Sequence, residues 1–329
     1  MRQGLVARAG VVVACVGLAG GAWPAHAAAQ GTGPGAGGGA GGGAGGGAVR
    51  QQNWDRCIGN DPDASIAGCT ELIRTGEEVE SNLANVYYNR AIAYIGKSDF
   101  DRAILDFDQV ITLNPRDPTA LFNRGNAYNF KGDYARAIHD LDQSLAIDAT
   151  KPQRFMARGI ARNRVGEYDL AISDFNAGLA LDPALAPLYN NRGNAFKDKG
   201  DLTKALEDFD HAIALNPRYA IAMDNRGFVL AMRGDYDRAI DSFNRSLAIN
   251  PSSAVVYDDR GAAWLRKGDA ARAIADFDAA LKLSPGRAAS LYGRGFAKRA
   301  RGDAAGAETD IAEAMRLQPD VAATMPLIR

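Results

Sequence analysis

Histidine and cysteine are scarce in this chain, and neither sign of charge predominates. There are 3 His and 3 Cys among 329 residues, and 38 Lys and Arg stand against 39 Asp and Glu. Binding to nucleic acid or to an anionic membrane surface generally needs a basic excess, so the composition argues against both. The sequence also has no strand pattern, no glycine loop of the kind that cradles phosphate, and no metal-ligand spacing. We therefore predict no catalytic site, metal or cofactor.

The first 27 residues have the features of a signal peptide. Arg2 and Arg8 precede an apolar stretch at 9–22, and Ala25-His26-Ala27 is a small-x-small cleavage pattern. The apolar stretch is too short for a membrane span, so no membrane insertion is expected after cleavage. An alternative is a lipoprotein signal, which would place a lipid on Cys15. Export, most simply to a bacterial periplasm, is the prediction.

Residues 28–49 are rich in glycine and are predicted to be a flexible linker. Two cysteines, Cys57 and Cys69, remain after the signal peptide. An even pair in an exported chain is typical of a disulfide, and two buried free thiols are the alternative.

From residue 84 the sequence repeats with a period of 34, without gaps. Each unit has an arginine followed by a small residue, an alanine 13 positions after that arginine, and a large apolar residue four positions later. Most units end at a proline. The arginines are Arg90, Arg124, Arg158, Arg192, Arg226, Arg260 and Arg294. Such self-similarity indicates an array of identical structural units.

Each unit is predicted to form two helices. In the unit 186–219, Tyr189, Gly193 and Phe196 share one helical face. Gly200 ends this first helix, and Asp201 begins the second as its N-cap. Asp133, Asp235, Asp269 and Asp303 recur at the N-cap position.

The order of aromatic, glycine, alanine, phenylalanine and proline positions resembles the tetratricopeptide repeat. The resemblance implies an all-α, right-handed superhelical solenoid of helix-turn-helix repeats. Moving back 34 residues from Ala91 and Ala103 reaches Cys57 and Cys69, so a degenerate unit is expected at 50–83. The tail, 322–329, is too short for a capping helix, so we expect that end to be either exposed or covered by a partner. The seven repeats are 84–117, 118–151, 152–185, 186–219, 220–253, 254–287 and 288–321.

The arginine row has a structural interpretation, because an aspartate follows most of these arginines 16 residues later. A pair between helices would satisfy both side chains. In two units the aromatic of the first helix is replaced by Arg162 and Lys298, and looser packing is expected there.

The resemblance also implies that the first helices line a concave groove that binds a peptide. Asparagine is a poor helix former, yet it recurs here, and its amide can bind a peptide backbone. This row is similar to the asparagine ladder of some superhelical family members; inheritance by duplication is the alternative. Asp224 adds to an acidic C-terminal half. The predicted groove residues are Tyr88, Asn89, Phe122, Asn123, Asn126, Asn129, Met156, Asn163, Asn191, Asn194, Asn225, Asp258 and Asp259.

These patterns predict a non-catalytic, exported scaffold that binds a protein or peptide. Two alternatives remain: a scaffold that associates with itself through its uncovered end, and a non-catalytic subunit of a helical-repeat enzyme complex. The partner and the oligomeric state are left undefined by the sequence.

Overall fold

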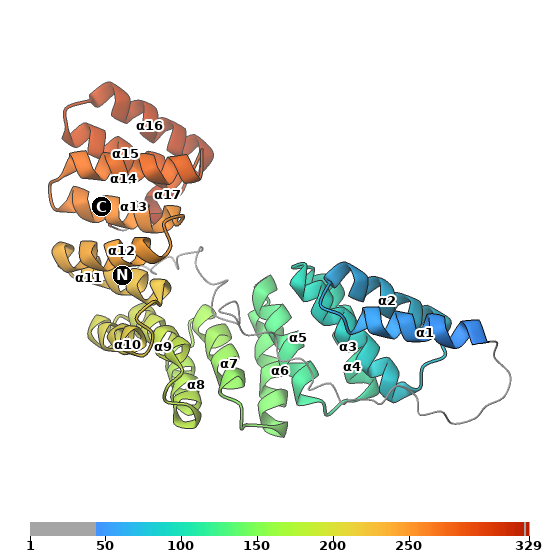
Figure 1. Ribbon diagram of the computed structural model, residues 1–329. Coiled ribbons are helices and arrows are strands. Elements are labelled where there is room, and N and C mark those ends of the chain that lie inside the picture. Colours follow the sequence, from blue (N-terminus) through green and yellow to red (C-terminus); the bar gives the residue numbers. More distant parts are fainter. Residues whose placement is uncertain (1–43, 326, 329) are drawn as a thin grey trace. The chain divides into compact units, whose positions relative to one another are not determined.

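The computed structural model describes residues 44–325 and 327–328, and these form helices joined by short turns (Figure 1). They divide into two compact units, one ending at Asp182 and the other beginning at Pro183. The predicted signal peptide and most of the predicted linker lie outside the described residues. Within the described residues there is no strand.

The first unit contains four helix pairs. Successive helices pack against each other, which gives the all-α solenoid that the sequence predicts. The helices are α1 (Ala44–Cys57), α2 (Pro62–Thr75), α3 (Glu80–Gly96), α4 (Phe100–Leu113), α5 (Pro118–Lys131), α6 (Tyr134–Ile147), α7 (Pro152–Arg164) and α8 (Tyr168–Leu181).

The second unit contains four further pairs and a final single turn. Its helices also pack in chain order. They are α9 (Ala186–Lys199), α10 (Leu202–Leu215), α11 (Ala220–Met232), α12 (Tyr236–Ile249), α13 (Ala254–Arg266), α14 (Ala270–Leu283), α15 (Ala288–Ala300), α16 (Ala304–Leu317) and α17 (Val321–Thr324).

Local chemistry sets the helix ends, as the pair α5 and α6 illustrates. The Asp117 carboxylate accepts hydrogen bonds from the backbone N–H groups of Thr119 and Ala120, at 2.8 and 3.0 Å. Gly132, with φ of 78°, ends α5 in the left-handed conformation, and Asp133 then caps α6. All five predicted aspartate N-caps are confirmed.

The core lies between the two helices of each pair. The large apolar residue of the second helix packs on the small residue of the first, as Phe209 does on Gly193. These large side chains are fully buried except Ile311, which is partly buried, and the recurring alanines are all fully buried. Burial of each large side chain contributes about 1.5–3 kcal/mol, and the buried apolar clusters continue from one helix pair to the next.

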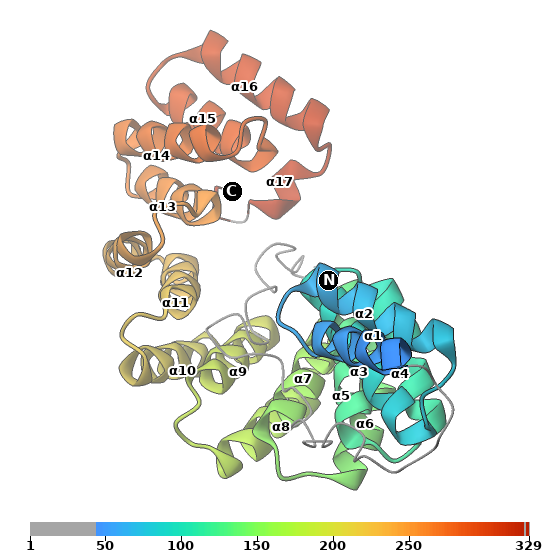
Figure 2. The ribbon, with the colours of Figure 1, turned by 45° about the vertical axis from the view of Figure 1, so that its right-hand side comes forward.

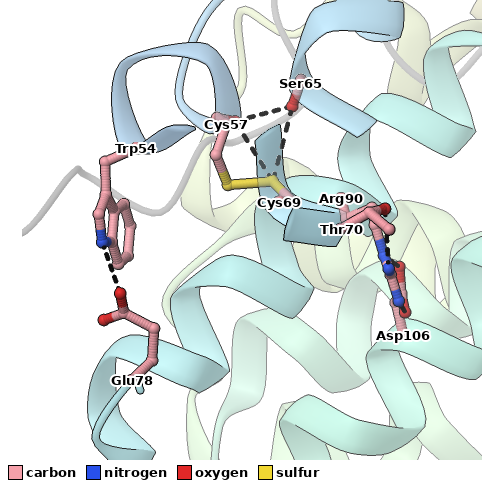
Figure 3. The surroundings of a disulfide bond; sticks show 8 residues. All are labelled: Trp54, Cys57, Ser65, Cys69, Thr70, Glu78, Arg90 and Asp106. Atoms are coloured by element: carbon pink, nitrogen blue, oxygen red, sulfur yellow. Dashed lines mark hydrogen bonds and ion pairs between the residues drawn. A yellow bond between two sulfur atoms is a disulfide. The ribbon is translucent and has the colours of Figure 1, made fainter. Parts of the chain in front are cut away.

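The N-terminal pair, α1 and α2, is held by a disulfide and by a buried carboxylate (Figure 3). Cys57 and Cys69 are bonded, with their Cα atoms 4.7 Å apart, so the predicted disulfide is present. Glu78 accepts hydrogen bonds from Arg50 at 2.8 Å and from Trp54 at 3.0 Å. Burial opposes ionisation of Glu78, but these donors outweigh it and lower its pKa.

Two predicted boundaries are wrong at the N-terminal side. α1 begins at Ala44, six residues inside the predicted linker, because each residue added to an existing helix gains a hydrogen bond. α3 begins at Glu80, four residues before the predicted repeat, with Val79 as its N-cap.

The tail after residue 321 is folded, which corrects the expectation of an end that is exposed or covered by a partner. α17 contacts α15 (Figure 2), and Val321, Met325, Leu327 and Ile328 are buried against the last helices. Gly293 allows close packing at this end: a Cβ on Gly293 would lie 2.4 Å from the Phe277 ring and 3.0 Å from the Ile328 side chain. Part of the surface proposed for self-association is therefore covered by the chain itself.

Candidate functional site

The seven arginines of the repeats are bound inside the fold, which confirms their structural interpretation. Arg192 donates to both oxygens of Asp208, at 2.7 and 2.9 Å. Arg226 is the exception, because Ser242 replaces the aspartate and accepts at 2.6 Å. Bidentate pairs of this kind are strong and directional. The other pairs are Arg90–Asp106, Arg124–Asp140, Arg158–Asp174, Arg260–Asp276 and Arg294–Asp310.

Most of these arginines also reach the second helix of the preceding repeat. Arg124 contacts Asp108 at 2.6 Å and Arg158 contacts Asp142 at 2.7 Å, each 16 residues earlier in the chain. One guanidinium therefore joins three helices. Because its donors are already committed to these carboxylates, the row is a structural element and not an anion-binding surface.

Arg162 and Lys298 do not loosen their repeats, contrary to expectation. Arg162 binds Asp174 at 3.0 Å, and Lys298 binds Asp310 at 2.8 Å. Each is a second cation on an aspartate that already carries an arginine. Burial tends to raise the pKa of Asp310, but Arg294 and Lys298 outweigh it and lower that pKa.

Most predicted groove residues are buried, and this includes several of the asparagines. Asn123 and Asn126 have no exposed surface, and Asn191 is 7% exposed. The remaining buried members are Tyr88, Phe122, Met156, Asp258 and Asp259, and Asp224 is buried as well.

These side chains connect successive first helices. Asn123 donates to the Tyr88 hydroxyl at 2.7 Å, and Asn225 donates to the Asn190 amide oxygen at 2.9 Å, in each case 35 residues apart. Asp258 accepts from Arg287 at 2.5 Å and from Ser290 at 2.6 Å. The row therefore holds repeats together, a role that a pattern within one repeat does not reveal.

Five predicted groove residues are only half-buried: Asn89, Asn129, Asn163, Asn194 and Asn225. Asn129 donates its amide N–H to the backbone carbonyl of Ala157 at 3.1 Å. The amide of Asn129 therefore binds a backbone carbonyl, which belongs to the first helix of the following repeat in the same chain.

A cleft of about 350 Å³ lies in the first unit, between the start of α3, the end of α4 and the residue that caps α5. Its lining includes the carboxylates of Glu80 and Asp117 and the apolar side chains of Val110 and Leu113. The sequence analysis missed this cleft. The only hint of the cleft in the sequence was that Asp117 differs from its equivalents in later repeats. Those equivalents are Lys151, Leu185, Tyr219, Ser253 and Arg287.

Comparison with known families identifies the repeats. Two family models, both described as tetratricopeptide repeat, match residues 88–153 and 184–252. The chain is a tetratricopeptide repeat protein. Proteins built of this repeat generally act as scaffolds for protein–protein interaction and are generally non-catalytic.

Solved structures show the same fold for this tetratricopeptide array. A tetratricopeptide repeat protein from Parabacteroides merdae aligns with a TM-score of 0.59 at 21% identity, covering 74% of this chain and 98% of that one. The Cut9–Hcn1 complex of the APC/C aligns at 0.62 and 16% identity, covering 86% and 55%. PilF of Pseudomonas aeruginosa aligns at 0.55 and 20%, covering 63% and 94%. No curated protein sequence gives a match.

Across residues 44–325 and 327–328, no three His, Cys, Asp or Glu side chains are grouped to hold a metal ion. Over the same residues, no helix has the length and apolar character needed to span a membrane.

Proposed function

We propose that this chain is an exported, non-catalytic scaffold that binds a peptide segment of a partner protein along the first helices of its repeats. The observation that carries the proposal is the bond from Asn129 to the Ala157 carbonyl, which shows an amide of this row holding a backbone. Asn89 lies one repeat before Asn123, and Asn163 lies one repeat after Asn129. Both retain exposed surface.

The first unit supplies the rest of the support. Its cleft is bordered by the start of α3, the helix that carries Asn89. Polar groups around an apolar wall are typical of a recognition site. Backbone contacts from the amides would give affinity, and the cleft would give specificity.

Export to an oxidising compartment such as a bacterial periplasm is part of the proposal. The disulfide between Cys57 and Cys69 supports it, because disulfides are rare in reducing compartments. Mass spectrometry of the secreted protein should find its first residue at or near Ala28. An intact Met1 would contradict export by cleavage, and a lipid on Cys15 would assign the lipoprotein route instead.

Binding can be tested with peptides displayed on phage. Twelve-residue random peptides would be selected against residues 28–329, and the affinity of the selected peptides measured by calorimetry. Changing Asn89 and Asn163 together to alanine should weaken binding by about tenfold or more, since each lost hydrogen bond costs about 0.5–1.5 kcal/mol. The variant should remain folded, because alanine favours the helix.

The matched control is His139→Ala, which changes an exposed side chain on the second helix α6. It should bind the selected peptides as the unaltered protein does. Failure to select any peptide, or equal loss in both variants, would refute a binding surface along the first helices.

A further inference from the structure

The core of the α1–α2 pair consists largely of its disulfide (Figure 3). Among residues 44–75, three apolar side chains are fully buried. Two of them are Cys57 and Cys69, which are 1% and 0% exposed, and the third is Leu72. Trp54 and Ile73 pack on this cluster but are only partly buried. Most of the fully buried apolar side chains of this pair are therefore the two that the disulfide joins.

The pair also lacks two features that hold the later pairs together. Six of the seven repeat arginines bind an aspartate of the second helix. One repeat earlier the corresponding residues are Arg56, which is exposed, and Leu72, so within residues 44–75 no such ion pair joins α1 to α2. Most later second helices fully bury a large side chain such as Phe107, whereas its equivalent here, Ile73, is only partly buried.

The contacts that would survive reduction of the disulfide are polar or partly exposed. Ser65 donates to the Cys57 carbonyl at 2.7 Å. Arg50, whose side chain is 29% exposed, donates to Glu78 at 2.8 Å. Hydrogen bonds that replace bonds to water contribute little net stability. Ile66 of α2 packs on the cluster of the following repeats but is only partly buried, so the fold of the pair depends on the disulfide.

We propose that the α1–α2 pair is a redox-controlled cover on the N-terminal end of the array. The cover is folded on α3 while Cys57 and Cys69 are bonded, and it unfolds as one unit when a dithiol reduces the bond. The dithiol gives two electrons and two protons to the two sulfurs and is itself oxidised to a disulfide, which leaves two cysteine thiols in the chain. The helices from α3 onward have an apolar cluster of their own and stay folded, because repeat arrays can open locally. This inference goes beyond the proposed scaffold function and does not depend on peptide binding.

Opening the cover moves the end of the array from α1 to α3. Val86 of α3 is fully buried in the cluster that contains Cys57 and Cys69, so unfolding of the pair exposes it. Arg90 of α3 also loses its hydrogen bond to Thr70, at 3.1 Å. The two sulfurs have almost no exposed surface, so a reductant reaches them only when the pair opens. Reduction and opening are therefore coupled.

Hydrogen exchange of residues 28–329, with and without dithiothreitol, tests the cover. Cys57 and Cys69 are the only cysteines in this range, so the reductant has a single target. Reduction should speed exchange of the α1 and α2 amides by about a hundredfold, the factor that cross-linking a loop of this length contributes. Exchange of the α4 to α8 amides should be unchanged. The fluorescence of Trp54 should shift to longer wavelength, measured in a Trp264→Phe chain so that Trp54 is the only tryptophan.

The control variant replaces Cys57 and Cys69 by alanine, the residue that the first repeat carries at both positions, as Ala91 and Ala103. Its α1 and α2 amides should exchange as fast as those of the reduced protein, with or without dithiothreitol. Slow exchange of these amides in the reduced protein or in the control variant would overturn the proposal. An equal acceleration in α4 to α8 would overturn it as well, because the pair would then not open as a separate unit.

Discussion

Replacing Gly159 by alanine probes a close contact between the two helices of one repeat. Gly159 of α7 faces Phe175 of α8, and a Cβ at Gly159 would lie 2.7 Å from Cε1 and 2.9 Å from Cζ of that ring. Carbon atoms in contact are normally about 3.5–4.0 Å apart. The ring is 1% exposed, so it has no open space to move into.

Two effects oppose each other in this variant. Overpacking a core costs about 1–3 kcal/mol. Alanine is a better helix former than glycine by about 1 kcal/mol. The overlap with two ring atoms places the packing cost in the upper half of its range. We therefore expect Gly159→Ala to destabilise the α7–α8 pair by about 1–2 kcal/mol.

Hydrogen exchange of the α7 and α8 amides is the suitable assay, because repeat arrays open locally and not always as one unit. A second variant tests the cause. The overlap is with the ring of Phe175, so Phe175→Ala should make room for the new methyl group. The double variant should regain at least about 1 kcal/mol relative to the sum of the two single changes. Strictly additive effects, or a Gly159→Ala protein as stable as the original, would refute the steric argument.

Three further predictions concern stability. Ser98 has a φ of 58°, which glycine adopts without strain, so Ser98→Gly should stabilise the protein by about 0.5–1 kcal/mol in urea unfolding. Changing Cys57 and Cys69 to serine should destabilise α1 and α2 by about 3 kcal/mol, seen as faster amide exchange there and not in α9 to α16. The pKa of Asp310 is lowered in the folded state, so its stabilisation is complete above about pH 4 and is lost as the pH falls. Asp310→Asn should therefore lower the melting temperature at pH 7 and have little effect near about pH 2; an equal effect at both would contradict the pairing.

The repeat architecture could be predicted because its determinants recur at a fixed period. Glycine, alanine and phenylalanine positions define the packing within one pair, and Asp201 and its equivalents begin the second helices. The pairing of most of these arginines with an aspartate 16 residues later was also visible, since both partners belong to one repeat.

The burial of the asparagine row could not be predicted in the same way. Whether Asn123 meets water or Tyr88 depends on how closely successive first helices approach, and no spacing within a repeat encodes that distance. The folding of the tail depends likewise on how its apolar side chains meet the last helices, which no spacing within a repeat encodes. The cleft beside Asp117 was missed because it breaks the repeat pattern that guided the interpretation.

The arginine row has a consequence for how the array can change in length. Arg226 reaches Asp210, 16 residues before it, and Arg260 reaches Asn244 at the same spacing. Deletion of residues 220–253 would therefore bring Arg260 to the place of Arg226, opposite Asp210, with its own Asp276 still attached. Whole repeats can be lost or duplicated without leaving a buried charge unpaired. An insertion of a few residues would strand one, so evolution can vary the number of repeats far more easily than the length of any one of them.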